Sequence, residues 1–429
     1  MKNGFIGVDV PSDDVITNCM HCGLCLPTCP TYNLTGRERS SPRGRIRLIK
    51  SVAEGELELT PGFIEEMNFC LDCQACETAC PAGVKYGSLV EAARNQIAIQ
   101  GRDSVKEKIV KKIFLKNVLS NKGQLKFVAK LLRFYQHSGL ETFVETTGLL
   151  RLFAPKLAKL QKLAPRIDEQ FFDEMHPEIL YPKGRIRHRV AFLSGCIMNV
   201  AFSKINEDTV KVLLHNDCQI IIPKEQGCCG SMQAHNGDFE TARELARKNI
   251  DTFMKHDFDY LVINSAGCGA LMKEYGHYLK DDPAYAERAE AFSKKVLDLT
   301  EFLAIIGMKA PDQPFEHRVA YHDACHLAHA QKVTVQPRML LKQIPGLTAV
   351  ELPESNWCCG SAGTYNMTHY DDSMKILARK MENVKTANAE YVVASNPGCL
   401  AQMQYGCELH DVHVEVIHFA TLLRNAYRL

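Results

Sequence analysis

The chain has 429 residues, of which 46% are apolar and 24% are charged, and its formal net charge is +1. This composition is typical of a soluble globular protein, and the length suggests about three domains. The net charge gives no reason to expect a nucleic-acid partner, and we expect none. No apolar run reaches the roughly 18 residues of a membrane span, and Met1–Pro11 has no apolar stretch typical of an export signal. With 18 cysteines, reduced thiols that bind metal in the cytoplasm are therefore favoured over disulfides.

Two cysteine runs of identical spacing dominate the first hundred residues. Both read C-x₂-C-x₂-C-x₃-C-P, one from Cys19 to Pro30 and one from Cys70 to Pro81. Bacterial-type ferredoxins hold [4Fe-4S] clusters with this run, and its fourth cysteine binds the other cluster. Structural zinc sites use two separated ligand pairs, and disulfides at this density suit short secreted chains. We therefore predict two [4Fe-4S] clusters, the first held by Cys19, Cys22, Cys25 and Cys80, and the second by Cys70, Cys73, Cys76 and Cys29.

The segment between the two runs predicts helices rather than the short hairpins of small ferredoxins. Apolar residues recur at near-helical spacing from Ile46 to Val52 and again from Phe63 to Met67. We therefore expect a helical two-cluster domain over residues 1–101. Arg43, Arg45 and Arg47 lie beside a turn of this segment. They either stabilise reduced clusters, present a docking face, or belong to a solvated turn.

A basic helical linker is expected over residues 102–185. Between Arg102 and Lys162 there are fourteen Lys or Arg and four Asp or Glu, an excess of ten positive charges. A basic amphipathic helix can lie on an anionic membrane surface or dock on an acidic partner, whereas a scaffold helix would only turn its cations to solvent. The residues expected on the apolar face beneath the cations are Leu115, Val118, Leu119, Leu125, Val128, Leu131 and Leu132.

The rest of the chain is an internal repeat, with expected limits at residues 186–310 and 311–429. His188–Cys196 returns as His317–Cys325, and Gly227–Ser231 returns as Trp357–Ser361. In the first repeat, strands are expected at 190–193, 219–222 and 260–263, with helices around 206–214 and at 239–254. Short apolar strands that alternate with helices are typical of a parallel sheet.

The cysteines of each repeat follow the carboxyl ends of these strands, where the loops of an open α/β sheet converge. Four thiols of each repeat should therefore meet. We identify Cys196, Cys228, Cys229 and Cys268 as a candidate third cluster site, and Cys325, Cys358, Cys359 and Cys399 as a candidate fourth. Zinc, or a thiol cluster without metal, remains an alternative at both sites.

At these residues the chain resembles the cysteine-rich CCG family, and within it most closely the iron–sulfur subunits of glycolate oxidases. The resemblance is carried by the two ferredoxin runs, Pro42–Arg45, Gly227–Gly230, Ser265–Gly269, Lys273–Gly276, His326, His329–Lys332 and Cys358–Tyr365. It implies an α+β multidomain fold, with a helical two-cluster ferredoxin domain followed by a duplicated α/β CCG domain. It also implies a subunit that takes electrons from an FAD-containing partner oxidising glycolate to glyoxylate, and passes them to a quinone or another carrier. The expected location is cytoplasmic or peripheral on the inner face of the cell membrane.

One departure concerns the end of each repeat. The full CCG pattern closes with C-x-x-C, but Leu271 and Gln402 occupy the last positions here. Each repeat then offers four thiols rather than five, which puts a noncubane cluster in doubt. Cys218 or Cys407 are the only cysteines left to substitute.

Two alternatives stay open at the level of sequence. A D-lactate dehydrogenase could use a similar electron-transfer subunit. A catalytic CCG protein of the heterodisulfide reductase type would need a proton donor beside its cluster, and His322, His326 and His329 around Cys325 are candidates. No G-x-G-x-x-G motif joins a strand to a helix, so we predict no flavin or nicotinamide site of that type. We also predict no catalytic residue in this chain. Because clusters accept single electrons, a partner must take the hydride.

Overall fold

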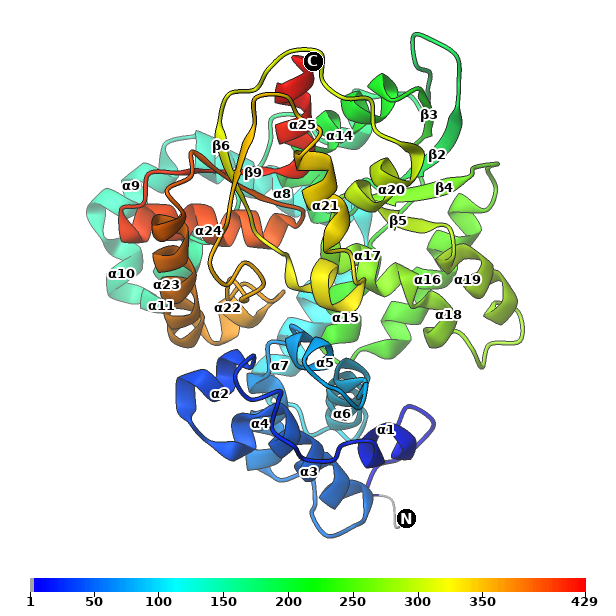
Figure 1. Ribbon diagram of the computed structural model, residues 1–429. Coiled ribbons are helices and arrows are strands. Elements are labelled where there is room, and N and C mark those ends of the chain that lie inside the picture. The colour runs from blue at the N-terminus through cyan, green and yellow to red at the C-terminus, as the bar shows by residue number, and fades with distance from the viewer. Residues whose placement is uncertain (1–3) are drawn as a thin grey trace.

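The computed structural model describes residues 4–429, apart from the side chains at positions 106, 107, 110 and 149. Figure 1 shows the amino-terminal domain in blue beneath a larger body that contains both sheets. None of the described helices is both long enough and apolar enough to span a bilayer. The predicted domain limits at residues 101, 185 and 310 stay predictions.

The amino-terminal domain is a set of short helices around the two cysteine runs. Ser41 and Thr60 cap α3 and α4, since the side chain of each accepts a hydrogen bond from a backbone N–H of the first turn, and a proline follows each. A capping hydroxyl followed by proline is a strong helix start. The core between these helices contains Phe63, Met67 and Leu89. The elements are α1 (Asp13–Thr17), α2 (Pro30–Thr35), η1 (Glu38–Ser40), α3 (Pro42–Ala53), α4 (Pro61–Phe69), α5 (Ala75–Thr78) and α6 (Tyr86–Ile99).

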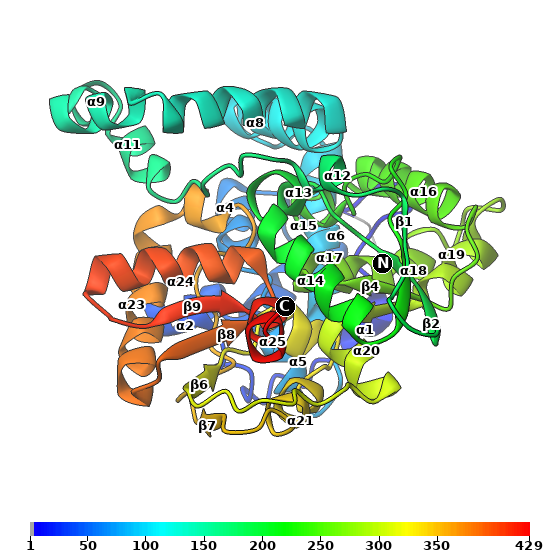
Figure 2. The ribbon, with the colours of Figure 1, turned by 90° about the horizontal axis from the view of Figure 1, so that it is seen from above.

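The linker forms a helical arm, which Figure 2 shows along one side of the molecule. Leu115, Leu119 and Leu125 are buried, as predicted, and pack with Phe171 of the chain that follows. The prediction was wrong for Val128 and Leu131, which are 41% and 55% exposed. The packed face of α8 is narrow, and Leu131 lies about 120° round the helix axis from Leu125. The elements are α7 (Val105–Val110), η2 (Lys111–Leu119), α8 (Lys122–His137), α9 (Leu140–Thr147), α10 (Leu149–Phe153), α11 (Pro155–Gln161) and α12 (Phe172–Met175).

The first repeat contains a five-stranded sheet in the order β1-β3-β2-β4-β5, parallel except for the edge strand β1. The three predicted strands and two predicted helices are confirmed to within three residues at each end, as β2, β3, β4, α14 and α16. The elements are β1 (Ile179–Leu180), β2 (His188–Phe192), α13 (Ile197–Ala201), α14 (Ser203–His215), β3 (Cys218–Ile221), α15 (Ser231–His235), α16 (Phe239–Phe253), β4 (Tyr260–Ile263), α17 (Ala266–Lys273), α18 (Tyr275–Tyr278), α19 (Ala286–Ser293), β5 (Val296–Asp298) and α20 (Leu299–Ile306).

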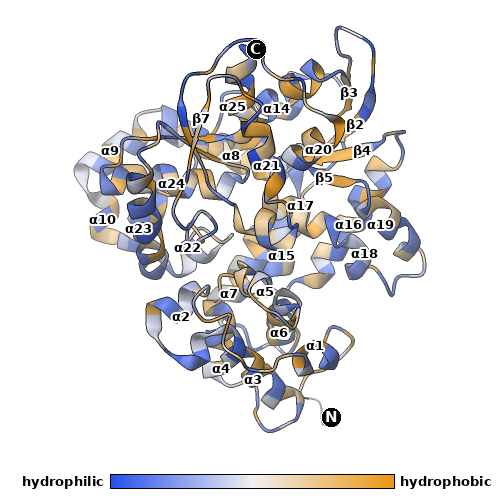
Figure 3. Cartoon of the chain, viewed as in Figure 1, coloured by the Kyte–Doolittle hydropathy of each residue, from blue (hydrophilic) through white to orange (hydrophobic). Residues whose placement is uncertain are grey.

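The second repeat contains a four-stranded parallel sheet in the order β7-β6-β8-β9. Its central strands β6 and β8 are largely buried, like β4 of the first repeat, which Figure 3 shows in the orange of apolar residues. The elements are β6 (Arg318–Tyr321), η3 (His326–Ala330), α21 (Val335–Leu341), β7 (Thr348–Val350), α22 (Tyr365–Thr368), α23 (Tyr370–Ala387), β8 (Tyr391–Ala394), α24 (Pro397–His410), β9 (Glu415–His418) and α25 (Phe419–Tyr427).

The two repeats share one hydrophobic core between them, and each has a further core on the opposite face of its own sheet. Phe192 of the first sheet and Tyr321 of the second belong to the same buried cluster, together with Phe302 and Phe419. α14 packs against α25, and α20 packs against α21. Each repeat therefore buries one apolar face of its sheet against the other repeat.

The amino-terminal domain docks on both repeats through α5 and α6. Arg94 Nη1 on α6 donates to the carbonyl oxygen of His235 at 2.8 Å, and Thr78 Oγ1 on α5 lies 2.9 Å from His329 Nδ1. Gly237 allows α6 to approach closely, because its φ is +78° and a Cβ there would lie 2.4 Å from the carbonyl carbon of Arg94. The ferredoxin-type domain is thus held directly below the cysteine-bearing edges of both sheets.

Candidate metal centres

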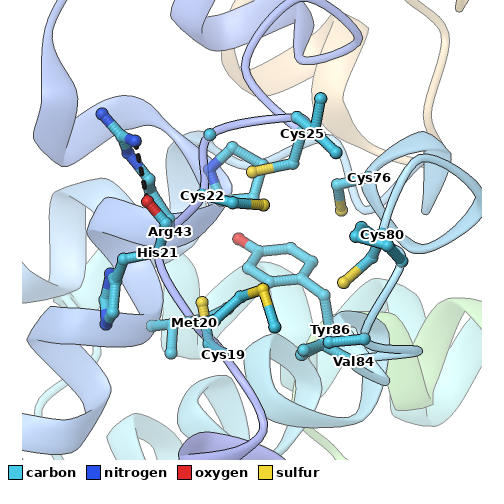
Figure 4. Close-up of a pocket in the computed structure, with 16 residues that line it drawn as sticks. Cys19, Met20, His21, Cys22, Cys25, Arg43, Cys76, Cys80, Val84 and Tyr86 are labelled. Atoms are coloured by element: carbon cyan, nitrogen blue, oxygen red, sulfur yellow. Dashed lines mark hydrogen bonds between the residues drawn. The ribbon is translucent and has the colours of Figure 1, made fainter.

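The first cavity of the amino-terminal domain collects the cysteines that the sequence assigned to cluster 1. Cys19, Cys22, Cys25 and Cys80 line it, and Cys76 reaches its inner side. Figure 4 shows their sulfur atoms arranged around the ring of Tyr86. Arg43 Nη1 donates to the carbonyl oxygen of His21 at 3.0 Å, and this bond ties α3 to the loop of the first run. This loop turns tightly, since His21 and Gly23 both have positive φ.

A second cavity lies behind the first and collects the cysteines assigned to cluster 2. Cys29, Cys70, Cys73 and Cys76 line it. Cys76 and Tyr86 line both cavities, and the Tyr86 hydroxyl donates to Cys70 Sγ at 3.5 Å. The fourth cysteine of each run therefore stands in the cavity of the other run, which is the arrangement that two neighbouring clusters require.

The three arginines of this domain have different environments. Arg45 is completely buried at the second cavity, where Nε donates to the carbonyl oxygen of Glu66 at 2.7 Å and Nη2 donates to Thr31 Oγ1 at 3.1 Å. Burial alone would lower the pKa of Arg45, but the charges of Tyr86, Cys70, Cys29 and Glu66 raise it above its ordinary value. The side chain of Arg47 is half exposed instead. Of the three roles considered for these arginines, stabilising a reduced cluster fits the buried Arg45, and a solvated turn fits Arg47.

The chemistry of these thiols fits metal binding. All 18 cysteines are free. Burial raises the pKa of Cys73 and Cys76 well above the ordinary value of a thiol. Thiols so placed would stay protonated without a cation, and they become good thiolate ligands when a metal replaces the proton.

The cysteines of the first repeat meet as predicted. Cys196 follows β2, the pair Cys228 and Cys229 follows β3, and Cys268 lies in the first turn of α17 after β4. The sulfur atoms of Cys196 and Cys228 are 3.6 Å apart, and the side chain of Cys229 interacts with those of Cys228 and Cys268. The backbone N–H of Gly230, whose φ is +90°, donates to Cys228 Sγ at 3.4 Å.

The cysteines of the second repeat form the same series. The side chain of Cys358 interacts with those of Cys325 and Cys359, and the side chain of Cys359 interacts with that of Cys399. This site lies against the second ferredoxin cavity, since Cys73 and Cys325 pack onto one buried cluster that contains Leu71, Trp357 and Cys358. The second repeat is therefore in direct contact with the cavity assigned to cluster 2.

The three histidines around Cys325 do not form one group. His326 Nε2 lies 3.1 Å from the carbonyl oxygen of Asp72, and His329 contacts Thr78, so both belong to the junction with the ferredoxin-type domain. His322 is buried beside Cys359 and Cys399. Burial, with the charge of Lys380, lowers the pKa of His322 to about 3. A ring that stays neutral to pH 3 is a poor proton donor at neutral pH, so the catalytic reading loses its main support.

Sequence reasoning missed a charged network at the junction. His235 Nδ1 lies 2.5 Å from Glu91 Oε1 and 3.3 Å from Asp72 Oδ2, and the Tyr278 hydroxyl donates to Glu91 Oε2 at 2.7 Å. The His235 ring also stacks on His326, with 4.8 Å between centroids. These residues come from distant parts of the chain, and no local motif marks them.

Sequence reasoning also missed Lys380. An alignment of the two repeats could have found it, because Lys380 lies 131 positions after Asn249, at the offset that relates the repeats.

The proposed substitutes for the missing fifth cysteine are too far away. Cys218 lies at the amino end of β3, about 10 Å of strand from the edge that carries Cys228. Cys407 lies two turns beyond Cys399 on α24, about 12 Å along the helix. Gln402, at the position of the missing cysteine, donates to Ser373 Oγ at 3.0 Å and accepts from Asn366.

Family models match most of the chain. Residues 15–84 match the 4Fe-4S dicluster domain, residues 190–273 and 319–404 match the cysteine-rich domain CCG, and residues 106–164 match the linker region of the glycolate oxidase iron-sulfur subunit. The chain is thus an iron–sulfur protein with a helical dicluster domain and two CCG domains. A solved structure, a hypothetical protein from Helicobacter pylori, aligns with a TM-score of 0.44 at 10% identity over 79% of this chain and 76% of its own, which is too distant to add to the assignment.

Curated relatives agree with the family models. The probable glycolate oxidase iron-sulfur subunit of Bacillus subtilis (strain 168) is 40% identical over 416 residues, which are 96% of this chain and 94% of that protein. The glycolate oxidase iron-sulfur subunit of Escherichia coli (strain K12) is 33% identical over 90% of this chain and 89% of its own. Lactate utilization protein A of Exiguobacterium is 30% identical, but over only 56% of this chain and 98% of its own. Coverage at this level over every domain shows that the chain belongs to the family of glycolate oxidase iron–sulfur subunits.

Proposed function

We propose that this chain is the electron-transfer subunit of a glycolate oxidase complex. It would receive electrons from an FAD-containing subunit that oxidises glycolate to glyoxylate, and pass them to a quinone or another carrier. One observation carries the proposal: the cavity of Cys19 and Cys80, the cavity of Cys29 and Cys70, and the cysteine site of the second repeat form a series in which each is in contact with the next.

The ligand assignment of the sequence is kept in this proposal. Cys19, Cys22, Cys25 and Cys80 would hold cluster 1, and Cys70, Cys73, Cys76 and Cys29 would hold cluster 2. The second-repeat site, and the first-repeat site beside it, are proposed as further cluster sites. Bound clusters would supply one-electron transfer. The chain supplies the separation between the clusters, the buried Arg45 that offsets negative charge, and the packing of Leu71 and Trp357 that keeps water out of the path.

The partner can be tested directly. Oxidation of glycolate releases two electrons and two protons, so a flavin must take both electrons before single-electron carriers accept them. We expect glycolate to bleach the clusters of this chain only when the flavoprotein is present. Reduction by glycolate of the purified chain alone would contradict the proposal. Replacing glycolate with D-lactate distinguishes the second candidate, which is favoured only by the partial similarity to the lactate utilization proteins.

We further propose that the linker arm lies against an anionic membrane, which would make the subunit peripheral on the inner face of the cell membrane. Phe127, Val128, Leu131 and Phe134 form an exposed apolar row along α8, and the exposed Lys130 lies among them. Apolar side chains flanked by cations suit an anionic lipid surface. We expect sedimentation with phosphatidylglycerol vesicles that is lost in Phe127→Ser/Phe134→Ser. A matched double change of exposed residues away from the arm, Ile6→Ser/Val8→Ser, should leave it unchanged.

A further inference from the structure

The two CCG repeats differ at the very positions that face their cysteine sites. In the second repeat, one donor atom each from His322, Cys359 and Cys399 lies within 4.8 Å of the others, and all three residues are buried. The repeat offset of 129 residues places Leu193 where the second repeat has His322, and the offset of 131 places Asn249 where it has Lys380. The first difference adds a polar group to the second site only, and the second difference replaces an amide with a lysine.

His322 has the properties of a ligand without its metal. It is 1% exposed, and neither ring nitrogen has a hydrogen-bond partner in the described part of the chain. The carbonyl of Ser355 lies close to the ring without meeting hydrogen-bond geometry. A buried imidazole with two free nitrogens costs free energy unless something binds it. An imidazole offers a metal the lone pair of one ring nitrogen.

His322 also lies where it could replace the fifth cysteine that the CCG pattern has and this chain lacks. The fifth cysteine of that pattern is replaced by Gln402, whose amide is hydrogen-bonded to Ser373 and Asn366. His322 leaves the end of β6, on the same edge of the sheet as the four cysteines, so the second site has five donor residues after all. The first site, with Leu193 in the same place, has four.

We propose that His322 is a ligand of an iron–sulfur cluster in the second repeat, together with cysteines of the set Cys325, Cys358, Cys359 and Cys399. The first-repeat site is then an all-cysteine site, so the two repeats hold different centres. Lys380 is fully buried near Cys359, donates to the carbonyl oxygen of Glu354 at 2.6 Å, and puts a further cation beside the second centre. Replacing thiolate with imidazole makes a cluster less negative and raises its reduction potential, as does a nearby cation. The second-repeat centre is therefore the one with the higher potential.

Pulsed EPR on the complete chain tests this inference, which rests on the proposed function because it requires a cluster in the second repeat. The protein is purified anaerobically with its clusters, with histidine in ¹⁴N or ¹⁵N form, and reduced in steps. We expect one reduced centre to show a strongly coupled nitrogen that changes with the histidine isotope. The coupling should vanish in His322→Gln and persist in His418→Gln. His418 is an equally buried histidine at an edge of the same sheet, but both of its ring nitrogens have partners, Asn264 and Ala420. In His322→Cys, the midpoint potential of the same centre should fall.

The outcomes separate the two proposals. Twelve to sixteen irons per chain, at four irons for each cluster, with no histidine coupling at any centre would overturn His322 as a ligand and leave the electron-transfer proposal standing. About eight irons, at the same four per cluster, would overturn the second-repeat cluster itself and leave only the two ferredoxin clusters as the path. A coupling that survives His322→Gln and disappears in His326→Gln would show that His326 is the ligand instead, and would also reject the inference.

Discussion

The charged network between the ferredoxin-type domain and the repeats gives a stability prediction that depends on pH. Burial alone would lower the pKa of His235, but Glu91 and Asp72 raise it from 6.5 to about 10. Because the pKa is raised in the folded state, this protonation stabilises the fold fully below pH 6.5, and the contribution is lost as the pH rises through 10. At 1.36 kcal/mol per pKa unit, it amounts to about 3 kcal/mol at pH 7.5 and about 1 kcal/mol at pH 9.5.

The variant His235→Phe tests this value. It keeps an aromatic ring to stack on His326 and removes the charge between the two carboxylates. We expect a loss of about 3 kcal/mol in the free energy of unfolding at pH 7.5, in the range found when one partner of a buried ion pair is removed. By pH 9.5 the difference from wild type should shrink to about 1 kcal/mol, since the wild type has by then lost most of the same contribution. Anaerobic urea unfolding followed by far-UV circular dichroism measures both values.

A control of the same chemistry separates charge from packing. The His215 ring packs at a tilt of 35° against Tyr427 with 4.2 Å between centroids, and burial lowers its pKa, so it is neutral over the whole range. The cost of His215→Phe should therefore not change between pH 7.5 and 9.5. A cost of His235→Phe that stayed constant or grew over this range would refute the assignment of a protonated His235.

Two further perturbations test the ferredoxin-type domain and its docking. Arg45→Met should lower the free energy of unfolding by about 1–3 kcal/mol, because the carbonyl oxygen of Glu66 and Thr31 Oγ1 lose a buried donor, whereas the Glu66 carboxylate keeps Arg39 Nε at 2.8 Å. The same variant should lower the midpoint potential of the adjacent cluster in an EPR-monitored titration, and Arg47→Met, at a half-exposed position, should change neither value appreciably. An unchanged potential in Arg45→Met would remove the electrostatic role given to this arginine. Gly237→Ala should cost about 2–4 kcal/mol from overlap with the Arg94 backbone and a left-handed φ, against about 1–2 kcal/mol for Gly148→Ala, which has positive φ but open space around it. Equal shifts of the thermal midpoint in the two variants would show that α6 does not approach Gly237 as described.

The sequence by itself determined the parts of this protein whose information is local. The spacing of the two cysteine runs predicts which thiols share a cavity, because an ordered run of i, i+3 and i+6 has one way to wrap a cluster. The Ser41-Pro42 and Thr60-Pro61 pairs begin two helices through capping and the fixed φ of proline. The alternation of apolar strands and helices predicts both parallel sheets, and the strand ends predict where eight further cysteines meet.

Tertiary structure decided what depends on distant residues meeting. The apolar faces of the two repeats are equally hydrophobic in sequence, and only their packing shows that Phe192 and Tyr321 share one core. The periodicity of α8 marks an apolar face without saying how much of it a neighbour covers, which is why Val128 and Leu131 were misplaced. Electrostatics follows the same rule: the charge of His235 is set by Glu91 and Asp72, which lie 144 and 163 positions before it. His322 stood out in the sequence only as a histidine near a cysteine, because a free ring nitrogen beside Cys359 and Cys399 exists only once three loops have come together at the edge of one sheet.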